Sequence, residues 1–179
     1  MNTIGKSPLV QYVETIANLK AGILQPTEAT KKPPLVEAVL SDACLEQLFL
    51  SFDKINRNHK FKGPLGYCYK TAYNIAAMDP DYVYCEGYAT SKQLSIPLMH
   101  AWCVHRKTNE VYDGVWNKRK TTGNAYCGIP LRLDFVTDCI LNTKHYGVID
   151  HLWMQRELLN TPLTSVIHPD YQDRIYAKF

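Results

Sequence analysis

Three short stretches of the chain contain residue types that could do nucleophilic chemistry. They are Gly66-Tyr67-Cys68-Tyr69, His100-Ala101-Trp102 and Val111-Tyr112-Asp113-Gly114-Val115-Trp116. A cysteine, a histidine and an aspartate can serve as a thiol nucleophile, its general base and the group that orients the base. Their order along the chain favours a cysteine-dependent enzyme.

The residues after Cys68 have the spacing of a helix. Tyr69, Ala72, Tyr73, Ala76 and Ala77 share one face, and Asp79-Pro80 ends the pattern. Cys68 is therefore expected at a helix N-terminus, where the macrodipole and unsatisfied amides favour the thiolate. Gly66 would let the chain turn sharply before it. The alternative is a buried cysteine that fills space beneath the helix.

His100 and Asp113 are expected on neighbouring strands of an antiparallel sheet. Segments 82–89, 98–105 and 110–116 are rich in β-branched and aromatic residues and are separated by polar turns. If the second hairpin loop is 106–109, Trp102 pairs with Asp113, and Asp113 lies one diagonal step, roughly 7 Å, from His100 on the same face. An odd-numbered loop would separate them. His100 could otherwise be a structural residue.

The rest of the chain is predicted to be mainly helical, which gives an α+β fold in one domain, 1–179. The expected parts are a helical N-terminal part (1–55), a catalytic core (66–130) and a helical C-terminal part (131–179). Within them, the apolar spacing predicts helices from Pro8 to about Gly22 and over 35–54, 135–141 and 148–159, a loop over 56–66, and an extended end with Pro162 and Pro169.

Composition narrows the classes of function. The chain has 179 residues, 46% of them hydrophobic, and a net charge of +3 without a dense Lys/Arg stripe, so nucleic acid is not an expected partner. It contains neither a run of ~20 apolar residues nor a signal peptide, so we expect no membrane association and a cytoplasmic location. Six scattered cysteines argue against a disulfide framework.

A zinc site is the first rival to the thiol chemistry. Its ligands would come from His100, Cys103 and His105, with Cys85 or Cys127 in addition. Strand alternation puts His100 on the opposite face from Cys103 and His105, and the chain has no Cys-x-x-Cys pair. We therefore expect neither a metal nor another cofactor.

The stretch from Gly66 to Trp116 resembles the transglutaminase-like branch of the papain-like cysteine hydrolases. The shared features are Gly-Tyr-Cys, Glu-Gly-Tyr-Ala at 86–89, His-Ala-Trp and Asp-Gly-Val-Trp. Tyr126 to Pro130 is also similar to a stretch in small uncharacterised phage and bacterial proteins. The resemblance implies a papain-like or transglutaminase-like core, in which the helix that begins at the nucleophile packs on a small antiparallel sheet.

The resemblance also implies a role for each residue of the set. Cys68 would be the nucleophile, His100 the general base and acid, and Asp113 the group that holds the imidazole. The glutamine that papain relatives place before the cysteine is absent, so the Cys68 backbone N–H is the first oxyanion candidate. Tyr67, Asn58 and Trp102 are secondary candidates for oxyanion stabilisation or substrate positioning.

The implied activity is a thiol hydrolase: a cysteine protease, amidase or deamidase that acts on a protein or peptide through an acyl-enzyme. Two alternatives stay open at this point. One is a transglutaminase-type transferase, and the other is a non-catalytic protein-binding module on the same fold. The sequence indicates neither the substrate nor the oligomeric state.

Overall fold

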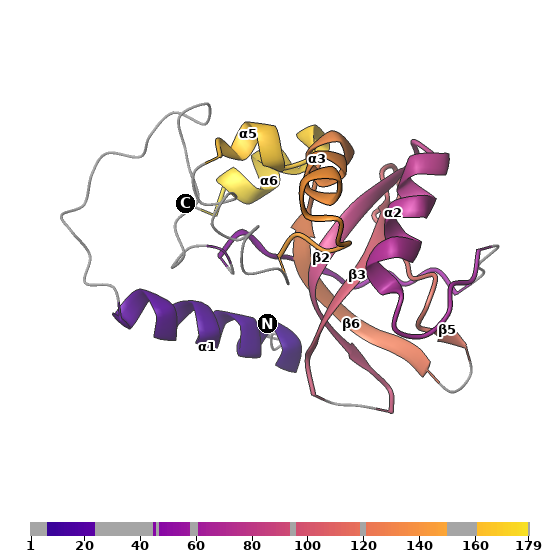
Figure 1. Cartoon of the computed structure of the whole chain (residues 1–179). Helices are drawn as coiled ribbons and strands as arrows, with labels where there is room; N and C mark the ends of the chain where they lie inside the picture. The colour runs from indigo at the N-terminus through magenta and orange to yellow at the C-terminus, as the bar shows by residue number, and fades with distance from the viewer. Residues whose placement is uncertain are drawn as a thin grey trace.

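The protein has an α+β architecture in which helices pack around one antiparallel sheet (Figure 1). The coordinates are a computed structural model. It describes residues 7–23, 45, 47–57, 61–93, 96–118, 121–149 and 161–178.

The main sheet has the strand order β1-β6-β2-β3-β4. The bounds along the sheet are β1 Leu50–Phe52, β6 Thr121–Pro130, β2 Tyr82–Ser91, β3 Leu98–His105 and β4 Val111–Tyr112, and a short β5, Asn117–Lys118, pairs with β6. Strands β2 and β3 form a hairpin and have nearly continuous buried runs, because helices cover the sheet. The predicted strands 82–89 and 98–105 are confirmed.

The predicted β3–β4 register is also confirmed. Val104 pairs with Val111, and the His105 amide donates to the Glu110 carbonyl at 2.9 Å, which closes a hairpin over residues 106–109. The predicted strand 110–116 was too long, since pairing stops at Tyr112. The chain turns there because backbone amides beyond Asp113 bond to its side chain instead of to a neighbouring strand.

Helix α2, Cys68–Met78, packs on β2 and β3 and begins at the residue that the sequence predicted. Its C-cap is Asp79, which is extended as a residue before proline should be. Inside the interface, the Cys103 thiol donates to the Ala72 carbonyl at 3.1 Å. The helix is thus fixed on the sheet along its buried side.

Helix α1, Pro8–Ile23, starts after Ser7, whose hydroxyl accepts a bond from the Val10 amide at 3.4 Å, so this predicted helix is confirmed. The predicted helix over 35–54 was wrong for its last turn, because Leu50–Phe52 is strand β1. Ser51 is exposed between buried Leu50 and Phe52, an alternation that suits a strand with one covered face. Residues 35–44 of that prediction lie outside the described residues.

The C-terminal part is more helical than the sequence indicated. Helix α3, Leu133–Thr143, contains the predicted helix over 135–141, but the extended end was wrong, because α5, Leu163–Val166, and α6, Pro169–Tyr176, occupy it. His168 caps α6 by accepting from the Asp170 amide, and Pro169 suits a first helical position. The helix predicted over 148–159 does not include Val148 or Ile149, and its remainder lies outside the described residues.

The largest buried side chains lie between the sheet and its covering helices and include Trp102, Tyr84, Tyr126 and Tyr171. No helix in the described ranges is both long and apolar enough to cross a bilayer.

Candidate active site

Cys68 lies in the first turn of α2, directly after a backbone turn that contains Gly66. Its thiol is half-buried, whereas the other four described cysteines are buried, and all five are free. Gly66 has φ +84°, and a Cβ at this position would meet nothing within 4 Å, so the glycine is required by backbone conformation alone. The turn therefore leaves the start of the helix accessible.

The N-terminus of α2 lacks a side-chain cap. Tyr67 is the N-cap residue and its side chain accepts no capping hydrogen bond, in contrast to His168 at the start of α6. Amides in the first helical turn have no acceptor within the helix, and a missing cap costs about 1 kcal/mol. The uncapped end leaves the Cys68 N–H in a position to stabilise an oxyanion.

His100 and Asp113 form a buried pair, as the hairpin register requires. The distance from His100 Nε2 to Asp113 Oδ2 is 2.8 Å, and the two residues are 2% and 1% exposed. Such burial disfavours charge unless each partner is matched. The bond occupies Nε2 and leaves Nδ1 for another partner.

Each carboxylate oxygen of Asp113 accepts two hydrogen bonds. Oδ1 accepts from the amides of Val115 and Trp116, each at 2.8 Å, and Oδ2 accepts from the Tyr126 hydroxyl at 2.8 Å as well as from His100. Burial raises the pKa of Asp113, but the His100 charge and the hydrogen bonds from His100, Trp116 and Val115 outweigh it, so the net shift is downward. Asp113 is thus held as an anion in a fixed orientation.

The same anion keeps the imidazole protonated. Burial lowers the pKa of His100, whereas the Asp113 charge, its hydrogen bond and the neighbouring Cys68 side chain raise it, to about 9 overall. Cys68 acts on this pKa through a hydrogen-bond and a coulombic interaction, which makes thiol and imidazole neighbours. A thiol next to an imidazole is the pairing that nucleophilic cysteine chemistry uses.

Trp116 covers the His–Asp pair on one side. Its ring stacks on the His100 ring with centroids 4.1 Å apart and planes 16° from parallel. A ring in this position limits access of water to the pair and stabilises a cationic imidazole through its π face.

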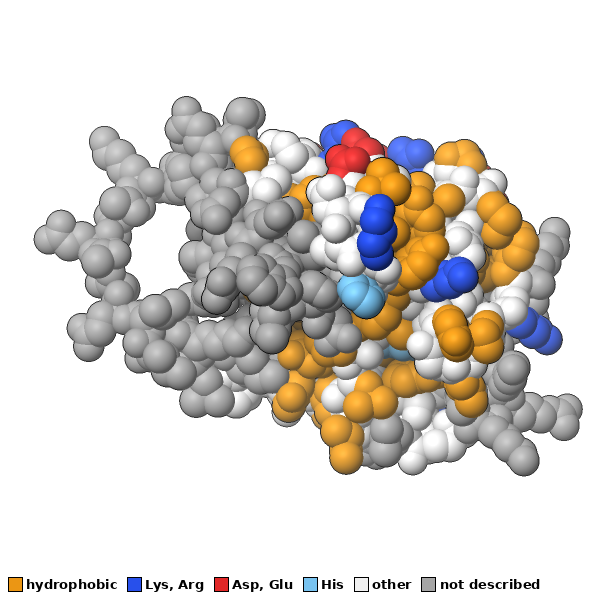
Figure 2. All heavy atoms as spheres, viewed as in Figure 1, with side chains coloured by type: hydrophobic (Ala, Val, Ile, Leu, Met, Phe, Trp, Pro, Cys, Tyr) orange, Lys and Arg blue, Asp and Glu red, His pale blue; other side chains and the backbone are white. Residues whose placement is uncertain are grey.

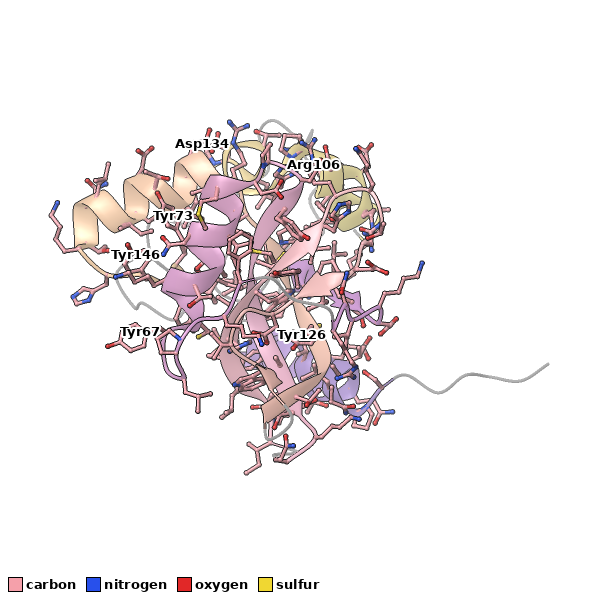
Figure 3. All side chains as sticks on the ribbon, turned by 90° about the vertical axis from the view of Figure 1, so that its right-hand side faces the viewer. Tyr67, Tyr73, Arg106, Tyr126, Asp134 and Tyr146 are labelled. Atoms are coloured by element: carbon pink, nitrogen blue, oxygen red, sulfur yellow. The ribbon has the colours of Figure 1, made fainter. Side chains whose placement is uncertain are left out.

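The secondary candidates from the sequence have different positions. Tyr67 is 57% exposed and projects outward at the start of α2 (Figure 3), so it can contact a substrate. Trp102 is fully buried, with its ring packed on Tyr126, so it lies beneath the surface, and its role in substrate positioning stays a prediction. Asn58 lies outside the described residues.

Sequence reasoning missed Tyr126. Its position beside Asp113 depends on β6 pairing with β2, through Ala89↔Tyr126 and Gly87↔Gly128. A Cβ on Gly128 would lie 2.7 Å from both the Glu86 carbonyl carbon and the Trp102 ring and still closer to the Glu86 carbonyl oxygen, so this glycine lets β6 approach β2 and makes room for Trp102. The only local signal was its place at the start of the Tyr126 to Pro130 stretch.

Glu86 was also missed. It is fully buried one residue before Gly87, the partner of His100 across the β2–β3 hairpin. Its carboxylate accepts from the Tyr84 hydroxyl at 2.6 Å and from the amides of Val148 and Ile149 at 2.7–2.9 Å. Glu86 thereby ties the segment after α3 to the sheet behind α2.

In the described part of the chain, no group of three or more His, Cys, Asp or Glu residues is placed to hold a zinc or other metal ion. The Cys103 side chain faces α2, whereas the His100 ring lies on the other face of the sheet with Trp102 and Tyr126.

A scan against protein-family models and searches of curated proteins and of solved structures found no match for this chain. The arrangement provides a half-buried thiol at an uncapped helix N-terminus, a neighbouring imidazole and a buried carboxylate bonded to that imidazole.

Proposed function

We propose that the protein is a cysteine-dependent acyl-transfer enzyme, a peptidase, amidase or deamidase that acts on amide bonds of a protein or peptide. Cys68 is the nucleophile, His100 the general base and acid, and Asp113 the residue that orients His100. We also propose that α2, β2 and β3 form the core of a papain-like or transglutaminase-like fold, and that the enzyme works in the cytoplasm, where a reducing environment keeps its thiols free.

The observation that carries the proposal is the buried His100–Asp113 pair next to a thiol at a helix N-terminus. A buried ion pair adds little stability compared with apolar residues of similar size, so stability alone is a weak reason to place one here. The same pair is useful if the imidazole must stay protonated, oriented and in contact with a thiolate.

In the reaction, the thiolate of Cys68 attacks the carbonyl carbon of the substrate and a C–S bond forms. The carbonyl π electrons move to oxygen, where the Cys68 N–H and the helix dipole stabilise the anion. The imidazolium of His100 then gives its proton to the leaving amine as the C–N bond breaks, which leaves a thioester and neutral imidazole. Neutral His100 then takes a proton from water while the water oxygen attacks the thioester carbonyl. The C–S bond breaks, the carboxylic acid product leaves, and the thiolate of Cys68 and the imidazolium of His100 are restored.

Replacement of that water by an amine would make the enzyme a transferase of the transglutaminase type. The His–Asp pair serves both outcomes equally, because only the second nucleophile differs. Hydrolysis is the simpler proposal, since the half-buried Cys68 admits water without a second binding site.

Alkylation of Cys68 by iodoacetamide tests the proposal. In the full-length protein near neutral pH, mass spectrometry of peptides should find label on Cys68 well before the buried cysteines, which act as internal controls. His100→Ala should slow this labelling, and so should Asp113→Asn, because the imidazolium depends on the carboxylate.

Incubation with p-nitrophenyl acetate tests the acyl-enzyme directly. One acetyl group should attach to Cys68 and should be lost with time in the wild type, whereas loss should be slower in His100→Ala. If Cys68 alkylates no faster in the wild type than in His100→Ala, and carries no acetyl group, the protein is not this enzyme and the binding-module alternative takes its place.

A further inference from the structure

An open groove runs along the face of α2 that is turned toward the loop before Cys68. Its volume is about 370 Å³. The residues that line it include Phe61 and Lys62 on the loop, Tyr67 at the N-cap of α2, and Lys70, Thr71 and Met78 on the helix. The spacing of the helical members gives one stripe from the first turn of α2 to the last. The groove therefore begins at the residue next to the nucleophile.

The loop wall of the groove is fixed to the strand that leads to Asp113. The Phe61 amide donates to the Tyr112 hydroxyl at 3.0 Å, and the Gly63 amide donates to the Gly114 carbonyl at 2.8 Å. The groove is thus bounded by two elements that also position the candidate triad, and its shape is held by hydrogen bonds.

Apolar side chains along the groove are unusually exposed. Phe61, Tyr67 and Met78 are 41%, 57% and 61% exposed, and all three line it. Large apolar side chains gathered at one exposed surface mark a binding site more often than single exposed ones do. The surface over α2 combines hydrophobic and basic side chains, whereas acidic ones gather at the upper edge of the face in Figure 2.

The charges in the groove are of one sign. Lys62 lies on the loop wall and Lys70 on the helix wall, and none of the described residues that line the groove is acidic. Within the described part of the chain neither lysine forms an ion pair; Lys70 Nζ lies 5.9 Å from the centre of the Tyr146 ring. The groove therefore suits a ligand that is apolar and negatively charged.

We propose that this groove binds the polypeptide substrate as an extended segment in which an apolar side chain lies next to acidic ones. The inference rests on the proposed function and adds its substrate class. An eleven-residue helix is ~16 Å long, so the groove holds about five residues of extended chain at ~3.3 Å each. The apolar side chain would contact Phe61 and Tyr67, and carboxylates would pair with Lys62 and Lys70.

Binding can be measured apart from catalysis in the full-length Cys68→Ala variant. The probes are three fluorescein-labelled decapeptides: one with Leu and Phe flanked by glutamates, one with lysines in place of the glutamates, and one with serines in place of Leu and Phe. We expect fluorescence anisotropy to show the first binding roughly tenfold more tightly than either of the others, because each exposed charge pair adds a severalfold factor at most.

Charge reversal in the groove provides the decisive comparison. Lys62→Glu with Lys70→Glu should weaken the glutamate peptide roughly tenfold and strengthen the lysine peptide. Lys92→Glu is the matched control, since Lys92 is exposed and borders a separate cavity beside the start of α1, and it should change neither affinity. A denaturation curve for each variant checks that it is folded.

Three results would overturn the substrate assignment: equal affinity for acidic and basic peptides, no effect of the double reversal, or equal binding of a single-stranded DNA decamer with the same loss on reversal. None of them affects alkylation of Cys68. Conversely, an inert Cys68 with intact, charge-dependent peptide binding would refute the enzyme and leave a peptide-binding groove.

Discussion

Replacing Asp113 with asparagine should remove a pH dependence of stability that originates at His100. The pKa of His100 is about 9 in the folded protein and ordinarily 6.5, a difference that corresponds to about 3 kcal/mol. Because the folded pKa is the higher one, this stabilisation is complete below about pH 6.5 and is lost as the pH rises through about 9. Wild-type protein should therefore lose about 3 kcal/mol from this group between about pH 6 and about pH 10.

In Asp113→Asn the imidazole stays buried but has lost its counter-ion. Burial then lowers the pKa of His100, so the imidazole is neutral at about pH 6 and at about pH 10. It therefore contributes no loss of unfolding free energy between these two pH values. Other groups also contribute in this range; the Cys127 thiol, for example, has an ordinary pKa of 9.0 that burial raises to about 12 in the folded protein. Such contributions are common to both proteins and cancel in the difference.

The assay is urea denaturation of both proteins at the two pH values, with the unfolding free energy extrapolated to water. An NMR titration of the His100 ring, assigned with His100→Gln, gives the pKa independently and should have its midpoint near 9. If the two proteins lose equal free energy between the two pH values, or the ring titrates near 6.5, His100 is not held as an imidazolium. The proposed thiolate–imidazolium pair would then have no basis.

Two further substitutions test how the site is positioned. Tyr126→Phe removes one of the four hydrogen bonds to Asp113 and should lower the unfolding free energy near pH 6 by about 2 kcal/mol, a typical value for a hydrogen bond to a charged group. Tyr12→Phe is the control, because it changes a tyrosine on the surface and should have little effect in the same denaturation assay. Equal effects of the two substitutions would mean that the hydrogen bond to Asp113 is unimportant for stability. Gly66→Ala should destabilise the protein by about 1 kcal/mol and slow alkylation of Cys68, because alanine resists a φ of +84°, whereas Gly66→Asn should stay closer to wild type, since asparagine tolerates this region. Identical behaviour of the two Gly66 variants in either measurement would show that backbone conformation at this residue is not what places the helix.

The sequence was informative where the relevant contacts are local. Helical spacing placed Cys68 at the first residue of α2, and the even hairpin loop placed Asp113 on the side of His100. Both depend on periodicity and on neighbours within about fifteen residues, which is the range over which side-chain patterns record structure. Helices α5 and α6 were missed because two prolines suggested an extended chain, although proline also suits a helix start, as Pro169 shows.

What the sequence by itself determined is the set of residue types, their order and the local elements that carry them. Tertiary structure alone decided that β6 pairs with β1 and β2, which brings Tyr126 to Asp113, and that Glu86 anchors the segment after α3. The reason is physical: strands distant in sequence pair only when the whole core is buried, and that balance of burial and loop closure leaves no local pattern to read. The same holds for the groove beside Cys68, which exists only because the loop before the helix is bonded to the strand that leads to Asp113.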